Sequence, residues 1–138
     1  MQRYDFSIPI FDVDVTLLQV ESKEDLDAVL GVCGELEMHE DNIKDISDTI
    51  NDDCYDGADT YWCANKHYAV CVFYPMKTDA RKRKCYAHEK RHVEDRVLKS
   101  CGIDDQEAAG YLAGYLEEEF HKLYVMKNDT NQEHIDCY

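Results

Sequence analysis

The sequence predicts an α+β fold in which a small antiparallel or mixed sheet packs on helices. Apolar residues alternate with period two in residues 4–20 and 60–74, whereas over residues 78–124 they recur with a helical period. The chain has 138 residues, and a chain of this length buries about 70% of its unfolded surface around a single core. We therefore expect one domain over residues 1–127, followed by a polar tail over residues 128–138.

The first 20 residues are expected to form two short strands, or one strand with a bulge near Pro9. Their alternating apolar positions change phase once, in the run Tyr4, Phe6, Ile8, Ile10, Phe11, Val13, Val15 and Leu17. Ser22 then precedes an acidic turn, which predicts a helix that closes near Gly34. A second helix with an acidic outer face is expected over residues 40–50.

The second half of the chain predicts a β-hairpin followed by two helices. The hairpin covers residues 60–74 and bends near Asn65, and its return strand alternates cleanly between two faces. Residues 78–100 contain neither Gly nor Pro, so a long helix should run up to the stop at Gly102. Asp104 is expected to cap a last helix that ends near Tyr124.

The charge of the chain argues against a general role in nucleic-acid binding, unless the basic segment 77–99 forms an isolated patch. The formal net charge is −15, although the segment 77–99 alone carries nine basic and four acidic residues. An acidic surface repels phosphate backbones, so we expect no nucleic-acid partner. An acidic protein that mimics DNA in order to block another protein stays an alternative.

The composition also predicts a cytoplasmic protein. No run reaches the roughly 18 apolar residues that a membrane span needs, and the first residues lack the apolar core of a signal peptide. The chain has seven cysteines without a CxxC pair, which indicates free thiols in a reducing compartment. We therefore expect no membrane partner.

The long helix carries the motif His88-Glu89-Lys90-Arg91-His92. Histidines four residues apart project from one helix face, so both imidazoles can bind one zinc ion at about 2.0–2.1 Å. Glu89 can then take a proton from a zinc-bound water and pass it to a leaving amine. The alternative interpretation is a solvated helix face with two surface histidines.

A catalytic zinc site needs a third protein ligand and leaves the fourth position to water. Position 98 is leucine, so the HExxHxxGxxH class is excluded. Glu107, at the start of an antiparallel following helix, is the first candidate, although it can also form a capping box with Asp104. The fallback candidates are Glu118 and Asp105.

The stretch from Ala87 to Leu116 resembles the small HExxH proteins encoded in bacteriophage genomes, in the minimal gluzincin arrangement. The resemblance implies that zinc is bound by His88, His92 and Glu107. It also implies a metallopeptidase that acts on a protein or peptide substrate, with Glu89 as general base and acid.

Two further roles accompany this interpretation. The oxyanion of the transition state needs a hydrogen-bond donor, for which Tyr111 and Tyr115 are the candidates. In gluzincin-like folds a strand edge beside the site pairs with an extended substrate, which the strand Tyr68–Tyr74 or its hairpin partner could do.

The alternative function is that of a non-catalytic phage structural or host-interaction protein that retains a zincin-like fold. Such a protein would have a closed metal site or none, whereas catalysis requires an open site beside a groove. The resemblance places the protein in the cytoplasm of an infected host cell, with the virion as the alternative location.

Overall fold

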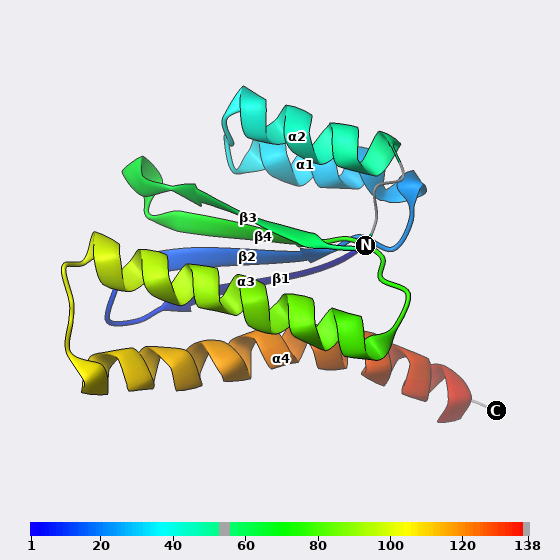
Figure 1. Cartoon of the computed structure of the whole chain (residues 1–138). Coiled ribbons are helices and arrows are strands. Elements are labelled where there is room, and N and C mark those ends of the chain that lie inside the picture. Colours follow the sequence, from blue (N-terminus) through cyan, green and yellow to red (C-terminus); the bar gives the residue numbers. More distant parts are fainter. Residues whose placement is uncertain (53–55, 137–138) are drawn as a thin grey trace.

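The computed structural model describes the backbone of residues 1–52 and 56–136, together with their side chains except those of 64 and 127–136. In this part of the chain the fold is α+β: a four-stranded mixed sheet lies between two pairs of helices (Figure 1). The elements are β1 (Gln2–Ile8), β2 (Val13–Gln19), α1 (Leu26–Glu35), α2 (Glu40–Asn51), β3 (Ala58–Cys63), β4 (Tyr68–Phe73), α3 (Asp79–Ser100) and α4 (Gln106–Asp136).

The strand order β1-β2-β4-β3 separates the two hairpins of the sheet. β1 pairs with β2 and β3 pairs with β4, both antiparallel, whereas β2 and β4 are parallel neighbours in the centre. β1 and β3 are therefore the two edges of the sheet. On one face, α3 lies against β3 and α4 against β1, so these two helices cover opposite halves of that face.

The phase change in the first 20 residues comes from a tight turn between two strands. This confirms the expectation of two short strands over that of one strand with a bulge. Ile8 ends β1 and pairs with Val13 at the start of β2. In the turn between them Asp12 adopts a φ of +51°, while Phe11 is buried and Ile10 is 71% exposed. The apolar alternation changes phase by one residue because the turn residues belong to neither strand.

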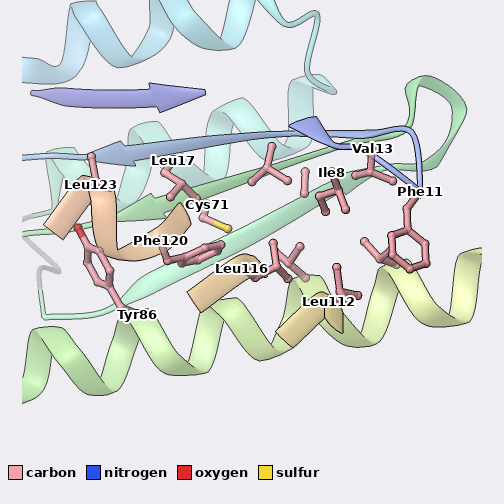
Figure 2. Packing of buried hydrophobic residues seen from close by; sticks show 14 of the residues in the cluster. Ile8, Phe11, Val13, Leu17, Cys71, Tyr86, Leu112, Leu116, Phe120 and Leu123 are labelled. Carbon is pink, nitrogen blue, oxygen red and sulfur yellow. The ribbon is translucent and has the colours of Figure 1, made fainter. Parts of the chain in front are cut away.

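The core has two layers because β4 is covered on both faces. Ala69, Cys71 and Phe73 point toward α3 and α4, as Figure 2 shows for Cys71. Val70 and Val72 point toward α1 and α2. The two-faced alternation expected for this strand is confirmed, and both faces are apolar because each meets a pair of helices.

The ends of α3 and α4 are fixed by specific contacts. Thr78 caps α3, since its hydroxyl accepts a hydrogen bond from the backbone N–H of Arg81 at 3.1 Å. Gly102 follows α3 with a φ of +66°, which a glycine adopts without strain. The expected cap of the last helix is wrong by one residue: Asp105, not Asp104, accepts from the backbone N–H of Glu107.

α4 is longer than the apolar period indicated. It continues beyond Tyr124 to Asp136, so most of the segment expected as a tail, 128–136, extends the helix. Residues 137–138 of the expected tail lie outside the described residues. Of the seven cysteines expected to be free thiols, Cys54 and Cys137 therefore lie outside them too. Cys33, Cys63, Cys71, Cys85 and Cys101 are free. No helix in the described residues combines the length and apolar character needed to cross a membrane.

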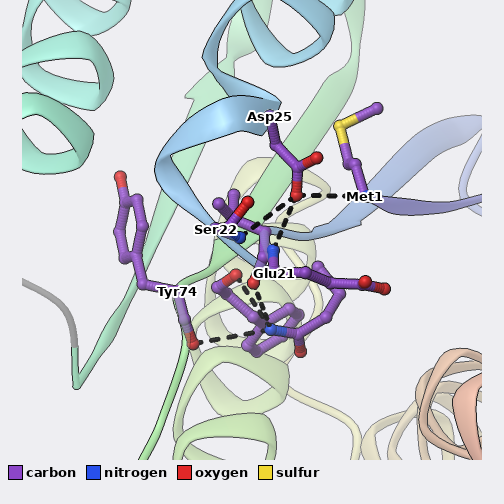
Figure 3. Close-up of polar contacts among 8 residues, drawn as sticks. Met1, Glu21, Ser22, Asp25 and Tyr74 are labelled. Atoms are coloured by element: carbon purple, nitrogen blue, oxygen red, sulfur yellow. Dashed lines mark hydrogen bonds and ion pairs between the residues drawn. The ribbon is translucent and has the colours of Figure 1, made fainter.

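Asp25 ties the start of α1 to the end of β2 (Figure 3). Its carboxylate accepts hydrogen bonds from the backbone N–H groups of Glu21 at 2.8 Å and Ser22 at 3.3 Å, and it lies 3.1 Å from the ammonium of Met1. Burial raises the pKa of Asp25, but these contacts together outweigh burial and lower the pKa below its ordinary value.

We expect Asp25→Asn to lower the free energy of unfolding at pH 7 by about 1–2 kcal/mol, because the amide replaces a charged acceptor. A lowered pKa in the folded state stabilises the fold above the unfolded pKa of about 3.9 and loses this effect as pH falls through the folded pKa. Urea denaturation at several pH values should therefore show the variant converging with the unaltered chain at acidic pH. Asp27→Asn, at an exposed position two residues on, should change little at any pH.

Candidate metal centre

His88, Glu89 and His92 form a cluster on α3 in which one ligand atom of each lies within 4.8 Å of the others. The two Nε2 atoms are 3.0 Å apart, and the imidazole rings are nearly perpendicular. Two nitrogens bound to one tetrahedral zinc ion at about 2.0–2.1 Å lie about 3.3 Å apart. The imidazoles thus converge to within a few tenths of an ångström of the spacing that one zinc ion requires.

The cluster opens into a hollow of about 500 Å³ between α3 and β3. Alternate residues of β3, Thr60 and Trp62, line its opposite wall. Both imidazoles are exposed, whereas Glu89 is only 3% exposed. The hollow is therefore reached from solvent, with the imidazoles accessible and the carboxylate buried behind them.

The buried carboxylate is held by the facing strand. The Thr60 hydroxyl lies 3.3 Å from Glu89 Oε1, to which it donates, and 3.4 Å from the sulfur of Cys71. Burial raises the pKa of Glu89, while the neighbouring imidazoles and the Thr60 hydrogen bond act in the opposite direction. A carboxyl group with a raised pKa suits general acid and base chemistry better than one at its ordinary value.

The charged residues between the histidines point away from the hollow. Lys90 contacts Glu94 of α3 at 2.9 Å and Glu117 of α4 at 3.3 Å. Arg91 is exposed and lies 3.5 Å from Asp95. Lys90 is thus part of the contact with α4, the Arg91–Asp95 pair is an exposed ion pair within α3, and neither Lys90 nor Arg91 lines the hollow.

The structure does not bring Glu107 to the histidines. The contact between Lys90 and Glu117 fixes the register of the antiparallel helices, and Glu107 lies ten residues earlier on α4, about 15 Å along the helix axis. It is exposed, and its backbone N–H is bound by Asp105. Moreover, α4 packs beside β1, whereas the hollow faces β3 at the opposite edge of the sheet.

The other candidates on or before α4 are not in the cluster either. Tyr115 donates its hydroxyl to the Ser7 carbonyl at the end of β1, and Tyr111 stacks on Tyr115 with 50% of its surface exposed. Asp105 caps α4, and Glu118 is exposed on it. Among the described residues, the cluster with potential metal ligands contains none of them.

Five residues that line the hollow were not identified from the sequence as parts of a site: Ala58, Asp59, Thr60, Trp62 and Arg96. Thr60 and Trp62 reach it only because β3 folds against α3, and no local pattern predicts that pairing. Arg96 also lines the hollow. Its position could have been found, because it follows His88 and His92 at the same four-residue spacing on one helix face.

Comparison of the chain with protein-family models, with curated proteins and with solved structures finds no match. The metal centre is therefore a candidate on the basis of its own geometry and chemistry.

Proposed function

We propose that the chain is a zinc-dependent peptide hydrolase in which His88 and His92 bind the metal and Glu89 is the general base. The observation that carries this proposal is the convergence of two imidazoles and a buried carboxylate at a hollow open to solvent. Catalysis requires such an open site, whereas a metal that only ties elements together is enclosed by protein ligands.

The donor set suits zinc. Imidazole nitrogens favour zinc and copper among the common metals, whereas magnesium and calcium favour oxygen ligands. Bound zinc would supply a water with a pKa of about 7. One ligand oxygen of Glu89 lies within 4.8 Å of the imidazole nitrogens, a distance that a single bridging water can span.

Glu89 has the surroundings that a proton carrier needs. Its carboxylate can accept a proton from the attacking water and later give it to the leaving amine. Burial favours the protonated form after the first transfer, and the Thr60 hydroxyl holds one carboxylate oxygen in place. The Trp62 ring, on the same wall as Thr60, adds an apolar surface for substrate.

The free edge of β3 supports a peptide as the substrate. β3 pairs only with β4 in the described sheet, so its other edge can hydrogen-bond to an extended chain. Of the two strands considered for this role, β4 is central and already paired on both sides. A peptide that adds to β3 would run alongside the hollow that contains His88 and Glu89.

The alternative is a non-catalytic interaction protein, and one observation favours it. Neither Glu107 nor another carboxylate of α4 approaches the histidines, so the third protein ligand implied by the resemblance is not at the hollow. Under this alternative the two histidines would bind zinc weakly or not at all. Metal affinity therefore separates the two functions.

Zinc titration of untagged protein is the test. We expect about one zinc ion per chain, and we expect His92→Ala to weaken binding more than about 100-fold, since even partners outside the coordination sphere contribute 10- to 100-fold. Isothermal titration calorimetry with a competing chelator measures both values.

Two variants serve as controls. His39→Ala removes an exposed histidine on another helix end, and Glu107→Gln removes the ligand implied by the resemblance. Both should leave zinc affinity unchanged. The proposal would be overturned by protein that binds no zinc, or by undiminished binding in His92→Ala. A loss of zinc in Glu107→Gln would contradict the arrangement of α3 and α4 described above.

A further inference from the structure

Arg96 lies in the hollow on the same side of α3 as the two histidines. It follows His92 by one helical turn, and its side chain is exposed. Four residues of an α-helix rise about 6 Å, so a positive charge lies about one turn along the hollow from the imidazoles. The hollow therefore has a metal-binding end and a cationic end.

Arg96 differs from every other arginine of the chain. Among the described residues the other four each contact a carboxylate, as Arg3 with Glu35, Arg81 with Asp56, Arg83 with Asp79 and Arg91 with Asp95. Within the same part of the chain no ion pair or hydrogen bond involves the guanidinium of Arg96. In a chain with 30 acidic residues, an arginine left unpaired beside a hollow is available to an external carboxylate.

We propose that Arg96 binds the C-terminal carboxylate of the peptide substrate, so that the chain acts as a carboxypeptidase. This inference rests on the proposed zinc-dependent hydrolysis. An extended peptide advances about 3.3 Å per residue. The 6 Å between the level of His92 and that of Arg96, together with the reach of the arginine side chain, therefore suits removal of one or two residues.

In the proposed hydrolysis, one molecule of water is added across the peptide bond. The oxygen of water forms a bond to the scissile carbonyl carbon, the C–N bond breaks, and a proton reaches the leaving amine through Glu89. The guanidinium takes no part in bond making. It holds the carboxylate through two parallel hydrogen bonds, which orients the last residues, while Trp62 lies in the same hollow to contact their side chains.

The same guanidinium could bind an acidic side chain of a substrate instead of its terminus. The two sources present the same group, so the experiment has to separate them. Three mercaptoacyl dipeptides do so: one with a free C-terminal carboxylate, its C-terminal amide, and an amide that carries a glutamate side chain. In each, the thiolate is a ligand for bound zinc, and the dipeptide extends from it along the hollow.

Binding of these compounds to the zinc-loaded chain can be followed through Trp62, the only tryptophan in the sequence. We expect the free acid to bind about 10- to 100-fold more tightly than either amide. In Arg96→Gln this preference should fall to about one, with zinc affinity unchanged. Arg91→Gln, in which the lost guanidinium points away from the hollow, should keep the preference.

Each contrary result has a distinct meaning. Equal binding of the free acid and the simple amide would overturn the role of Arg96 and leave the zinc proposal intact. Preference for the glutamate-bearing amide, lost in Arg96→Gln, would overturn recognition of the terminus in favour of an acidic side chain. Failure to bind zinc, measured before any dipeptide is added, would overturn both proposals.

Discussion

Glu89→Gln is expected to reduce peptide hydrolysis by about 10²- to 10⁴-fold while zinc affinity changes little. Glutamine keeps the size of the side chain and can still accept the Thr60 hydrogen bond, but it cannot take a proton from water. Initial rates on a defined mixture of short free-acid peptides, followed by mass spectrometry, measure the loss. Zinc titration of the same sample establishes that the metal is retained.

Glu94→Gln is the matched control for this prediction. Glu94 is also a buried glutamate of α3, but it contacts Lys90 on the side of the helix that faces α4. Its replacement should leave the rate within a few-fold of the unaltered chain. An undiminished rate in Glu89→Gln would remove Glu89 from catalysis. No hydrolysis by a zinc-loaded chain would favour the non-catalytic alternative.

Phe73→Ala is expected to lower the free energy of unfolding by about 3–5 kcal/mol. Phe73 is fully buried at the end of the central strand β4, where its ring stacks on Tyr86 at 4.0 Å between centroids and meets Phe120 edge to face at 6.3 Å. Alanine would leave a cavity between β4, α3 and α4 that these aromatic rings cannot fill. Urea denaturation monitored by circular dichroism measures the change.

An exposed aromatic residue provides the comparison. Tyr111→Ala removes a ring that is 50% exposed and stacked on Tyr115, so we expect a cost below about 1 kcal/mol. Similar costs at the two positions would contradict the description of the core. Because Tyr111 lies away from the hollow, its replacement should also leave zinc affinity unchanged.

Most helices and strands of this fold could be predicted from the sequence because each is specified by a pattern within its own residues. Alternating residues of β4 predicted two faces, and the structure covers both. The absence of Gly and Pro before Gly102 predicted the length of α3. The end of α4 was missed, since the apolar period fades after Tyr124 while the backbone stays helical to Asp136.

The candidate site could be predicted only as far as one helix extends. The spacing of His88 and His92 is a property of the α-helix, so their convergence follows from the sequence once α3 is recognised. The partners across the hollow, Thr60 and Trp62, come from a strand about 30 residues away. The periodicity of apolar residues within a helix or strand cannot predict a contact between two such distant segments.

The sequence by itself determined that His88, Glu89 and His92 lie on one helix, with the two histidines on one face. Only the tertiary structure decided that β3, and not α4, lies beside these three residues. The order β1-β2-β4-β3 places β3 and α3 at one edge and β1 and α4 near the other, so the antiparallel helix that carries Glu107 lies away from the hollow. The physical reason is that helix packing on a sheet follows the apolar faces of whole elements, whereas a short motif specifies only the geometry of its own helix.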